Sequence, residues 1–248
     1  MIVSLEGQMR HHVIAQRLIS ALDLGSAPIA LTFVDSAPDG LPAAAQPRPS
    51  ACSFWRDAEH GTFFASAVAH LNCALGAMVM GFDLPAETYR TLGDIVTMMC
   101  ECSYLDPIEA DKVPSMAGPS NGIVYGPLAQ HPLPPDLVLM WLSPKQAMLF
   151  NEAAGTASWA AGSTAVTGRP ACAALPLASA DAVPTMSFGC TGMRTFTEVA
   201  DDHMLSVVPG QRLERFTAAV EGTQKANHAM TRYYQQQKEQ LAAVDVER

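Results

Sequence analysis

Asp136-Leu137-Val138-Leu139-Met140-Trp141-Leu142 is the clearest strand pattern in the chain, because six apolar residues follow one aspartate without a break. A short apolar run of this kind is typical of a strand that is buried on both faces. Ser143 and Pro144 follow it, and they are a good N-cap and a good first residue for a helix. We therefore expect a buried strand that is followed at once by a helix over 145–154.

The start of the chain also combines a helix with a buried strand. Apolar residues recur at helical spacing from Met9 to Leu24, and Gly25 is a suitable stop. Pro28-Ile29-Ala30-Leu31-Thr32-Phe33-Val34 indicates a buried strand that ends at a turn. Shorter patterns predict helices over 73–82, 86–102 and 213–240 and strands over 62–65, 123–128 and 204–208, while 53–56 fits either element.

These elements predict an α/β or α+β fold in a single mixed domain. We expect its central strands to contain Leu31, Phe33, Val138, Leu139 and Trp141. A buried strand, a helix and a pair of cysteines occur once on each side of a proline cluster at 132–135. We interpret this recurrence as two pseudo-equivalent halves.

The domain is expected to span residues 1–212, and the long polar helix over 213–248 is expected to be exposed or to grip a second subunit. The expected partners are therefore a further copy of the chain, in a homo-oligomer, and a small-molecule substrate. The net charge of −9 argues against nucleic acid or an anionic membrane as the main partner. The start lacks a secretory pattern and no apolar run reaches the ~20 residues of a membrane span, so we expect a cytoplasmic protein.

Four of the six cysteines stand in two similar frames. Arg48-Pro49-Ser50-Ala51-Cys52 is followed after 20 intervening residues by Cys73, and Arg169-Pro170-Ala171-Cys172 is followed after 17 by Cys190. Cys190 lies within Ser187-Phe188-Gly189-Cys190-Thr191-Gly192-Met193-Arg194, where glycines flank the thiol and allow a close approach to it. If a helix begins at Cys73, its free N–H groups favour a thiolate there.

At these residues the sequence resembles the family called domain of unknown function 169, over roughly residues 20–210. The resemblance rests on Cys52, Cys73-Ala74-Leu75-Gly76, Tyr125-Gly126-Pro127-Leu128, Pro135-Asp136-Leu137-Val138-Leu139, Cys172, Ser187–Arg194 and Asp201-Asp202. It implies that the chain is one unit and that the glycine-flanked cysteines belong together, but it implies no activity. Cys100 and Cys102 lie outside the family pattern, and their role stays open.

We expect Cys52, Cys73, Cys172 and Cys190 to face a common cavity and to ligate a metal. Their spacing matches neither zinc ribbons nor ferredoxins, so this expectation depends on their context. In a reducing compartment, soft thiolates that converge select an iron–sulfur cluster, zinc or copper(I). The cluster ranks first, because the loops at Gly76, Gly189 and Gly192 offer backbone N–H groups to its sulfides. The alternative is that these cysteines are small buried hydrophobes.

Two further residues are candidate catalytic groups. His70 is a ligand or a proton donor on the rim of the cavity, or else a hydrogen-bonded core histidine. Arg194 binds an anionic substrate or the charge of the cluster, or else pairs with Asp201 or Asp202. Met98-Met99-Cys100-Glu101-Cys102 carries copper(I) donors, although a methionine-rich helix face is more often core.

The motifs of phosphate-loop nucleotide binding, dinucleotide binding, zinc proteases and serine hydrolases do not occur in the sequence. The function expected is a cysteine-ligated metal protein that binds or acts on a small molecule, with redox chemistry as one form. If the chain is an enzyme, we expect an iron–sulfur-dependent oxidoreductase or lyase. The alternative is a non-catalytic ligand-binding or structural module whose cysteines pack in its core.

Overall fold

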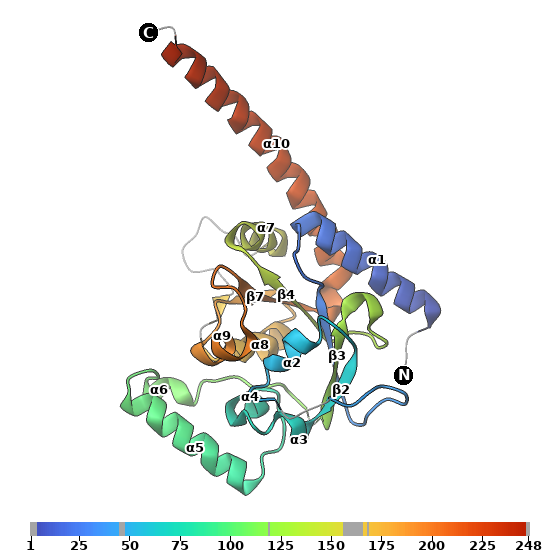
Figure 1. Cartoon of the computed structure of the whole chain (residues 1–248), viewed down its shortest axis with the longest axis vertical. Coiled ribbons are helices and arrows are strands. Elements are labelled where there is room, and N and C mark those ends of the chain that lie inside the picture. Colours follow the sequence, from blue (N-terminus) through green and yellow to red (C-terminus); the bar gives the residue numbers. More distant parts are fainter. Residues whose placement is uncertain (1–3, 45–47, 119, 156–165, 168, 247–248) are drawn as a thin grey trace.

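The computed structural model describes residues 4–44, 48–118, 120–155, 166–167 and 169–246, and its core is one sheet of seven strands (Figure 1). The strand order is β2-β3-β1-β4-β7-β6-β5. All neighbours are antiparallel except β5 and β6, which are parallel. The strands are β1 Ile29–Val34, β2 Phe63–Ser66, β3 Gly122–Pro127, β4 Leu137–Leu142, β5 Val166–Thr167, β6 Thr185–Ser187 and β7 Met204–Pro209.

Strand β4 lies at the centre of this sheet, and all six of its residues are buried. Because successive side chains of a strand point to opposite faces, each face needs its own cover. Leu137, Leu139 and Trp141 join one hydrophobic cluster. Val138, Met140 and Leu142 join a second cluster. The continuous apolar pattern thus reflects a sheet that is covered on both sides.

Helices cover the sheet in two layers (Figure 1). The cluster around Val138 is completed by helices α1 Leu5–Leu22, α7 Pro144–Ala154 and α10 Leu213–Val246. The cluster around Leu139 is completed by short helices α2 Ser53–Asp57, α4 Ala74–Val79, α8 Ala174–Asp181 and α9 Thr191–Thr197. The remaining α-helices are α3 Ala67–His70, α5 Ala86–Glu101 and α6 Pro107–Ala110, and the 3-10 helices are η1 Leu128–Gln130, η2 Ala171–Ala173 and η3 Gly210–Arg212.

The mixed single domain and its central strands are confirmed. Ser143 closes a capping box with Gln146 at the start of α7, where the sequence places a helix start. The end of α1 differs from the expectation, because Asp23 takes the left-handed cap conformation two residues before Gly25. The ambiguous run over 53–56 is helical and forms most of α2. Among the described residues, no helix has both the length and the apolar character needed to cross a membrane.

The strand order bears on the expected halves without deciding them. Outward from the boundary between β1 and β4, one side of the sheet runs β1, β3, β2 and the other runs β4, β7, β6. The order along the chain is the same on both sides. The middle strand of each trio, β3 or β7, is the last of its trio in the sequence. This arrangement is compatible with a duplication, which stays a prediction.

Candidate functional site

The four cysteines singled out by the sequence lie on one face of the sheet, at the starts of short helices. Cys52, Cys73 and Cys190 are the N-cap residues of α2, α4 and α9. Cys172 lies in η2, which leads into α8. All four belong to or pack against the same hydrophobic cluster, so they come together although 137 residues intervene between the first and the last.

The ionisation of the two buried thiols reflects first their burial and then the neighbouring thiols. Burial raises the pKa of Cys52 to about 12, and the thiols of Cys73 and Cys190 raise it further, while a hydrogen bond from Ser50 opposes the shift. Burial also raises the pKa of Cys172, and all three other thiols add to that rise. Charges influence one another in this way only over short distances. Cys52 and Cys172 are therefore protonated at neutral pH.

The thiols are gathered but do not form a finished metal site. Within the described ranges, no three histidine, cysteine, aspartate or glutamate side chains are arranged to hold a metal ion. Cys100 and Cys102 lie at the end of α5, where Cys102 is exposed and its thiol is 3.5 Å from the carbonyl oxygen of Met99. A metal would therefore require the loops that carry the four thiols to adjust.

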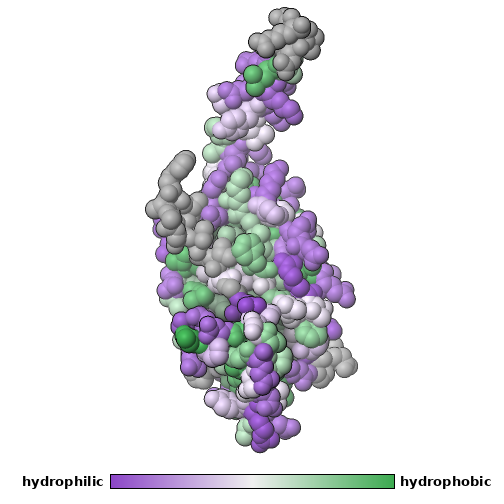
Figure 2. Space-filling model, turned by 90° about the vertical axis from the view of Figure 1, so that its left-hand side faces the viewer, coloured by the Kyte–Doolittle hydropathy of each residue, from purple (hydrophilic) through white to green (hydrophobic). Residues whose placement is uncertain are grey.

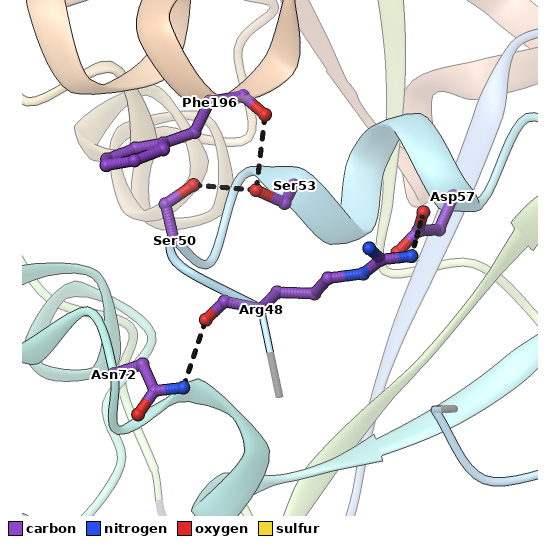
Figure 3. Close-up of polar contacts among 6 residues, drawn as sticks. All are labelled: Arg48, Ser50, Ser53, Asp57, Asn72 and Phe196. Carbon is purple, nitrogen blue, oxygen red and sulfur yellow. Dashed lines mark hydrogen bonds and ion pairs between the residues drawn. The ribbon is translucent and has the colours of Figure 1, made fainter. Parts of the chain in front are cut away.

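Serine hydroxyls tie the Cys52 loop to α9 (Figure 3). Ser50 Oγ lies 3.0 Å from Cys52 Sγ and 3.0 Å from Ser53 Oγ. Ser53 Oγ donates in turn to the carbonyl oxygen of Phe196, at 3.4 Å. These contacts join the segment before α2 to the helix that begins at Cys190, and the sequence analysis did not identify them.

Arg48 organises the outer side of the same loop (Figure 3). Its guanidinium forms two hydrogen bonds of 2.7 Å to the carboxylate of Asp57. Its carbonyl oxygen accepts a bond of 3.3 Å from Asn72, the residue before Cys73. A cavity of about 330 Å³ lies beside these groups, and its lining includes Arg48, Ser53, Arg56, Asp57 and Phe196. This cavity is the surface recess next to the Cys52 loop.

His70 is buried and hydrogen-bonded at both ring nitrogens. Nδ1 lies 2.8 Å from the carbonyl oxygen of Ser66 and therefore carries the proton. Nε2 then accepts from the hydroxyl of Tyr125, at 2.9 Å. Burial lowers the pKa of His70 to about 4, so the ring is neutral. Burial also raises the pKa of Tyr125, and Cys52 and Cys172 add to that rise.

Of the two alternatives for His70, a residue on the rim of a cavity or a hydrogen-bonded core histidine, the structure shows the core histidine. The ring is only 1% exposed, so it does not lie on the rim of a cavity. Its ring packs against those of Phe54 and Phe82, with centroids 4.8 Å away in both cases. The hydrogen-bonded His70–Tyr125 pair thus belongs to the packed aromatic core on the same side of the sheet as the cysteines.

Gly76 permits the close packing of the Cys73 thiol. A Cβ at this position would lie 2.9 Å from Cys73 Sγ and 2.9 Å from the Cβ of Ala51. Real Cβ atoms do not approach other atoms so closely, so a side chain here would displace the thiol or the Cys52 loop. Glycine is therefore needed where the two cysteine segments of the N-terminal half meet.

The two glycines around Cys190 differ from each other. Gly189 has a φ of +93°, a conformation that favours glycine, and a Cβ there would lie 2.4 Å from Met193 Cε. Gly192 has no neighbour within 4 Å of a Cβ position. The backbone conformation at Gly189 thus favours glycine, the space at Gly192 is open, and the expected approach of a group to the Cys190 thiol stays a prediction.

Arg194 closes the loop on either side of α9. Its guanidinium donates to the carbonyl oxygens of Phe188, His203 and Ala200, at 2.7, 3.0 and 3.3 Å. Asp202 pairs with His203, and neither Asp201 nor Asp202 forms an ion pair with Arg194. The guanidinium therefore binds backbone carbonyls, so the alternative of an aspartate pair is wrong, while a role toward a substrate or cluster stays a prediction.

Tyr104 and Arg169 form a contact that the sequence analysis missed. The guanidinium carbon of Arg169 lies 3.9 Å from the centre of the Tyr104 ring. The backbone N–H of Thr191 donates to the Tyr104 hydroxyl at 3.4 Å, next to Cys190. The loop after α5 therefore contacts the segments that precede Cys172 and follow Cys190. In the sequence, the one sign of this contact was the position of Arg169 three residues before Cys172, which matches the frame of Arg48 before Cys52.

A second and larger cavity lies at one end of the sheet. Its volume is about 880 Å³, and its lining includes Phe33, Asp35, Met116, Leu133, Asp136 and Ser179. Asp136 accepts a hydrogen bond of 2.8 Å from the backbone N–H of Phe33, and burial raises the pKa of its carboxyl group. Polar and apolar groups share this lining, and more of its surface is polar than apolar. Concave sites with a few fixed polar groups are typical of small-molecule binding.

Fold and site together define a mixed α+β protein with a gathered set of cysteines beneath short helices. The chain belongs to the family described as "Uncharacterised ArCR", the domain of unknown function 169, whose model matches residues 17–219. This match confirms the resemblance seen in the sequence. Comparison with curated proteins and with solved structures gives no match.

Proposed function

We propose that the chain is a thiol-ligated metal protein, with an iron–sulfur cluster as the preferred cofactor, that binds or acts on a small molecule. The observation that carries the proposal is that Cys52, Cys73, Cys172 and Cys190 all belong to or pack against one hydrophobic cluster. Three of the four thiols belong to N-cap residues of short helices, and the fourth lies in η2 just before α8, an arrangement that packing alone does not call for. Their softness favours iron–sulfur clusters, zinc or copper(I).

The residues around the thiols fit such a cofactor in two respects. Burial keeps Cys52 and Cys172 protonated, and a bound cation would favour their thiolate forms and release protons. The surrounding apolar cluster would exclude water from the ligands. Ligation by three of the cysteines would leave a coordination position for a substrate of an oxidoreductase or lyase, whereas ligation by all four would favour electron transfer.

The proposal is tested by metal loading of the full chain without oxygen. The protein is treated in turn with ferrous iron and sulfide, with zinc and with copper(I), and retained metal is measured after desalting. We expect one of these to be retained in a stable amount. Cys172→Ala should lower that amount by at least about tenfold, and Cys100→Ala should leave it unchanged. A folded wild-type chain that retains none of the three would refute the proposal.

The alternative function is a ligand-binding module whose cysteines pack in the core. The cavity of about 880 Å³ beside Asp136 favours it. Asp35 and Asp136 line this cavity, whose surface is more polar than apolar, so the fitting ligand class is a polar molecule with a cationic or hydrogen-bond-donating group. Thermal unfolding with a panel of alkyl and aryl amines tests this function. Stabilisation that Asp136→Asn abolishes would support it, and no stabilisation by any amine would count against it.

A further inference from the structure

Helix α10 is held to the domain over its first half only. Arg10 pairs with Glu214, Arg17 forms bonds of 2.7 and 2.8 Å to Glu221, and Gln224 donates to the carbonyl oxygen of Ser20 at 3.3 Å. Each pair is separated by 204 residues, so α1 and α10 run parallel in constant register. Because α1 ends at Leu22, this support ends near residue 226 of α10.

The second half of α10 extends beyond the domain (Figure 1). Among the described residues, Asn227 makes the last side-chain bond of α10 to the body, at 2.8 Å to Glu152 of α7. Every residue from His228 to Ala242 is exposed. These 15 residues form about four turns, roughly 22 Å of helix. Figure 2 shows hydrophobic side chains among the hydrophilic ones on this protruding segment.

A single apolar seam runs along both halves of α10. The α10 seam follows the alternating three- and four-residue spacing of paired helices. Its members are Leu213, Phe216, Val220, Thr223, Asn227, Met230, Tyr234, Gln237 and Leu241. The first three are at most 4% exposed and pack into the domain. Met230, Tyr234 and Leu241 are 47%, 60% and 70% exposed. The exposed seam thus continues an interface that the same helix already uses.

The exposed half has one side-chain hydrogen bond along its own surface, from Gln237 to the hydroxyl of Tyr233 at 2.8 Å, and little else to stabilise it as a solitary helix. Its charged side chains are Arg232, Lys238 and Glu239, and no two opposite charges lie three or four residues apart. Helices of this length are marginal in water unless an apolar face is packed. The stripe of Met230, Tyr234 and Leu241 is therefore an apolar face that packing against a partner surface would stabilise.

We propose that this partner is the same segment of a second copy, in antiparallel orientation. Where the seam enters the domain, α1 and α7 lie against it. A parallel partner that faced the seam would bring its own α1 and α7 into the same space, whereas an antiparallel partner places the two domains at opposite ends.

The antiparallel register is self-complementary. It sets Met230 opposite Leu241 of the partner subunit and Tyr234 opposite Gln237 of the partner subunit. Two-fold symmetry repeats both pairs, so the two Met230–Leu241 layers lie on either side of two central Tyr234–Gln237 layers. This inference is independent of the proposed metal function, since no residue of the exposed half touches the cysteine cluster.

The test is sedimentation velocity of the full chain over a wide range of concentrations. We expect a dimer. Met230→Lys with Leu241→Lys should weaken it by at least about 100-fold, because each dimer then buries four ammonium groups. The matched control is Gln235→Lys with Ala242→Lys, which adds the same charge on exposed positions away from the seam and should dissociate like the wild type. A monomer, or a dimer that the seam variants do not weaken, would overturn the proposal.

A charge exchange tests the orientation. Met230→Lys alone and Leu241→Glu alone should each weaken the dimer, and the two together should restore it. In an antiparallel pair each introduced lysine faces an introduced glutamate, whereas a parallel pair brings like charges together. Failure of the double variant to recover would overturn the antiparallel register. Thermal unfolding of each variant verifies that the domain is folded, since these side chains do not contact it.

Discussion

The two sides of the sheet place their cysteines at corresponding points but surround them differently. Cys73 follows β2 and Cys190 follows β6, and these strands occupy matching positions on either side of the centre. Near Cys73 the chain buries a neutral histidine against a tyrosine. Near Cys190 it places a half-exposed arginine that binds three carbonyl oxygens. Strand order thus sets where the thiols lie, and local side chains set how each segment is held.

The length of the connections also differs between the sides. Between α4 and β3 the chain inserts α5 and α6, which stand away from the sheet (Figure 1). Between α9 and β7 it inserts six residues, 198–203, which Arg194 closes with hydrogen bonds. The N-terminal side is therefore stabilised by buried rings and the C-terminal side by a short bonded loop. This contrast can be tested by changes on one side at a time.

The largest expected effect concerns metal retained by single-cysteine variants from each side. If both sides serve one centre, Cys73→Ser and Cys190→Ser should each lower retained metal by at least about tenfold. If each side formed its own site, either variant would keep about half of the wild-type amount. Elemental analysis after loading distinguishes the two results. Cys102→Ser is the control, since that thiol is exposed at the end of α5.

Acid should lower the free energy of unfolding, because the folded protein buries two neutral histidines, His70 and His131. The second lies 2.8 Å from the hydroxyl of Thr32 in β1, on the N-terminal side of the sheet. Burial lowers the pKa of His70 to about 4 and that of His131 to about 3, against 6.5 for an ordinary histidine. The unfolded chain therefore binds these protons first, and stability present above pH 6.5 is lost as the pH falls toward 4 and 3. At about pH 5, each histidine should cost about 2 kcal/mol of the free energy of unfolding.

Urea unfolding at pH 7.5 and at pH 5 measures this loss. His70→Gln should remove about half of the histidine contribution to the difference between the two pH values, whatever it does to stability at pH 7.5. His12→Gln changes an exposed histidine and should leave the difference unchanged. A His70→Gln variant with the full wild-type difference would show that the histidine is not neutral in the folded protein.

The sequence predicted those parts of the fold that are determined locally. Six consecutive apolar residues define β4, and Ser143 with Pro144 defines the start of α7, because these signals lie within the elements. The helical state of α2 could not be settled, since five residues contain little more than one turn. Strand order could not be predicted either, because it depends on pairings between distant segments such as β1 with β4.

The candidate site shows the same division. Glycine-flanked cysteines were visible in the sequence, and the fold brings them together. The roles of Ser50 and Tyr125 were not visible in the sequence, because their partners are distant along the chain. Ser50 is linked through Ser53 to the carbonyl oxygen of Phe196. Tyr125 is hydrogen-bonded directly to His70. The sequence left His70 open between the rim of a cavity and a hydrogen-bonded core position, because neighbouring residues give no sign of the three aromatic rings that enclose it.

On the C-terminal side, Arg194→Met should cost about 2 to 3 kcal/mol of the free energy of unfolding. The variant loses hydrogen bonds to three carbonyl oxygens, each worth about 1 kcal/mol. Arg194→Lys should recover only part of this, since one ammonium group cannot reach all three oxygens in the geometry of the guanidinium. Urea unfolding gives both values. A neutral Arg194→Met variant would mean that the loop is closed by other contacts.

The smallest effect compares one glycine from each side. Gly76→Ala should lower the free energy of unfolding by about 1 kcal/mol, because overpacking against Ala51 and the Cys73 thiol outweighs the gain in helix propensity. Gly192→Ala meets no neighbour, so the propensity gain should leave it neutral or stabilise it by about 0.5 kcal/mol. Thermal and urea unfolding measure both.

Since the alanine at position 76 presses on the thiol, it should also slow or reduce metal loading, whereas Gly192→Ala should not. Equal stability of the two variants would show that the Cys73 and Cys52 segments are not packed tightly at Gly76, and the two sides would then hold their thiols alike.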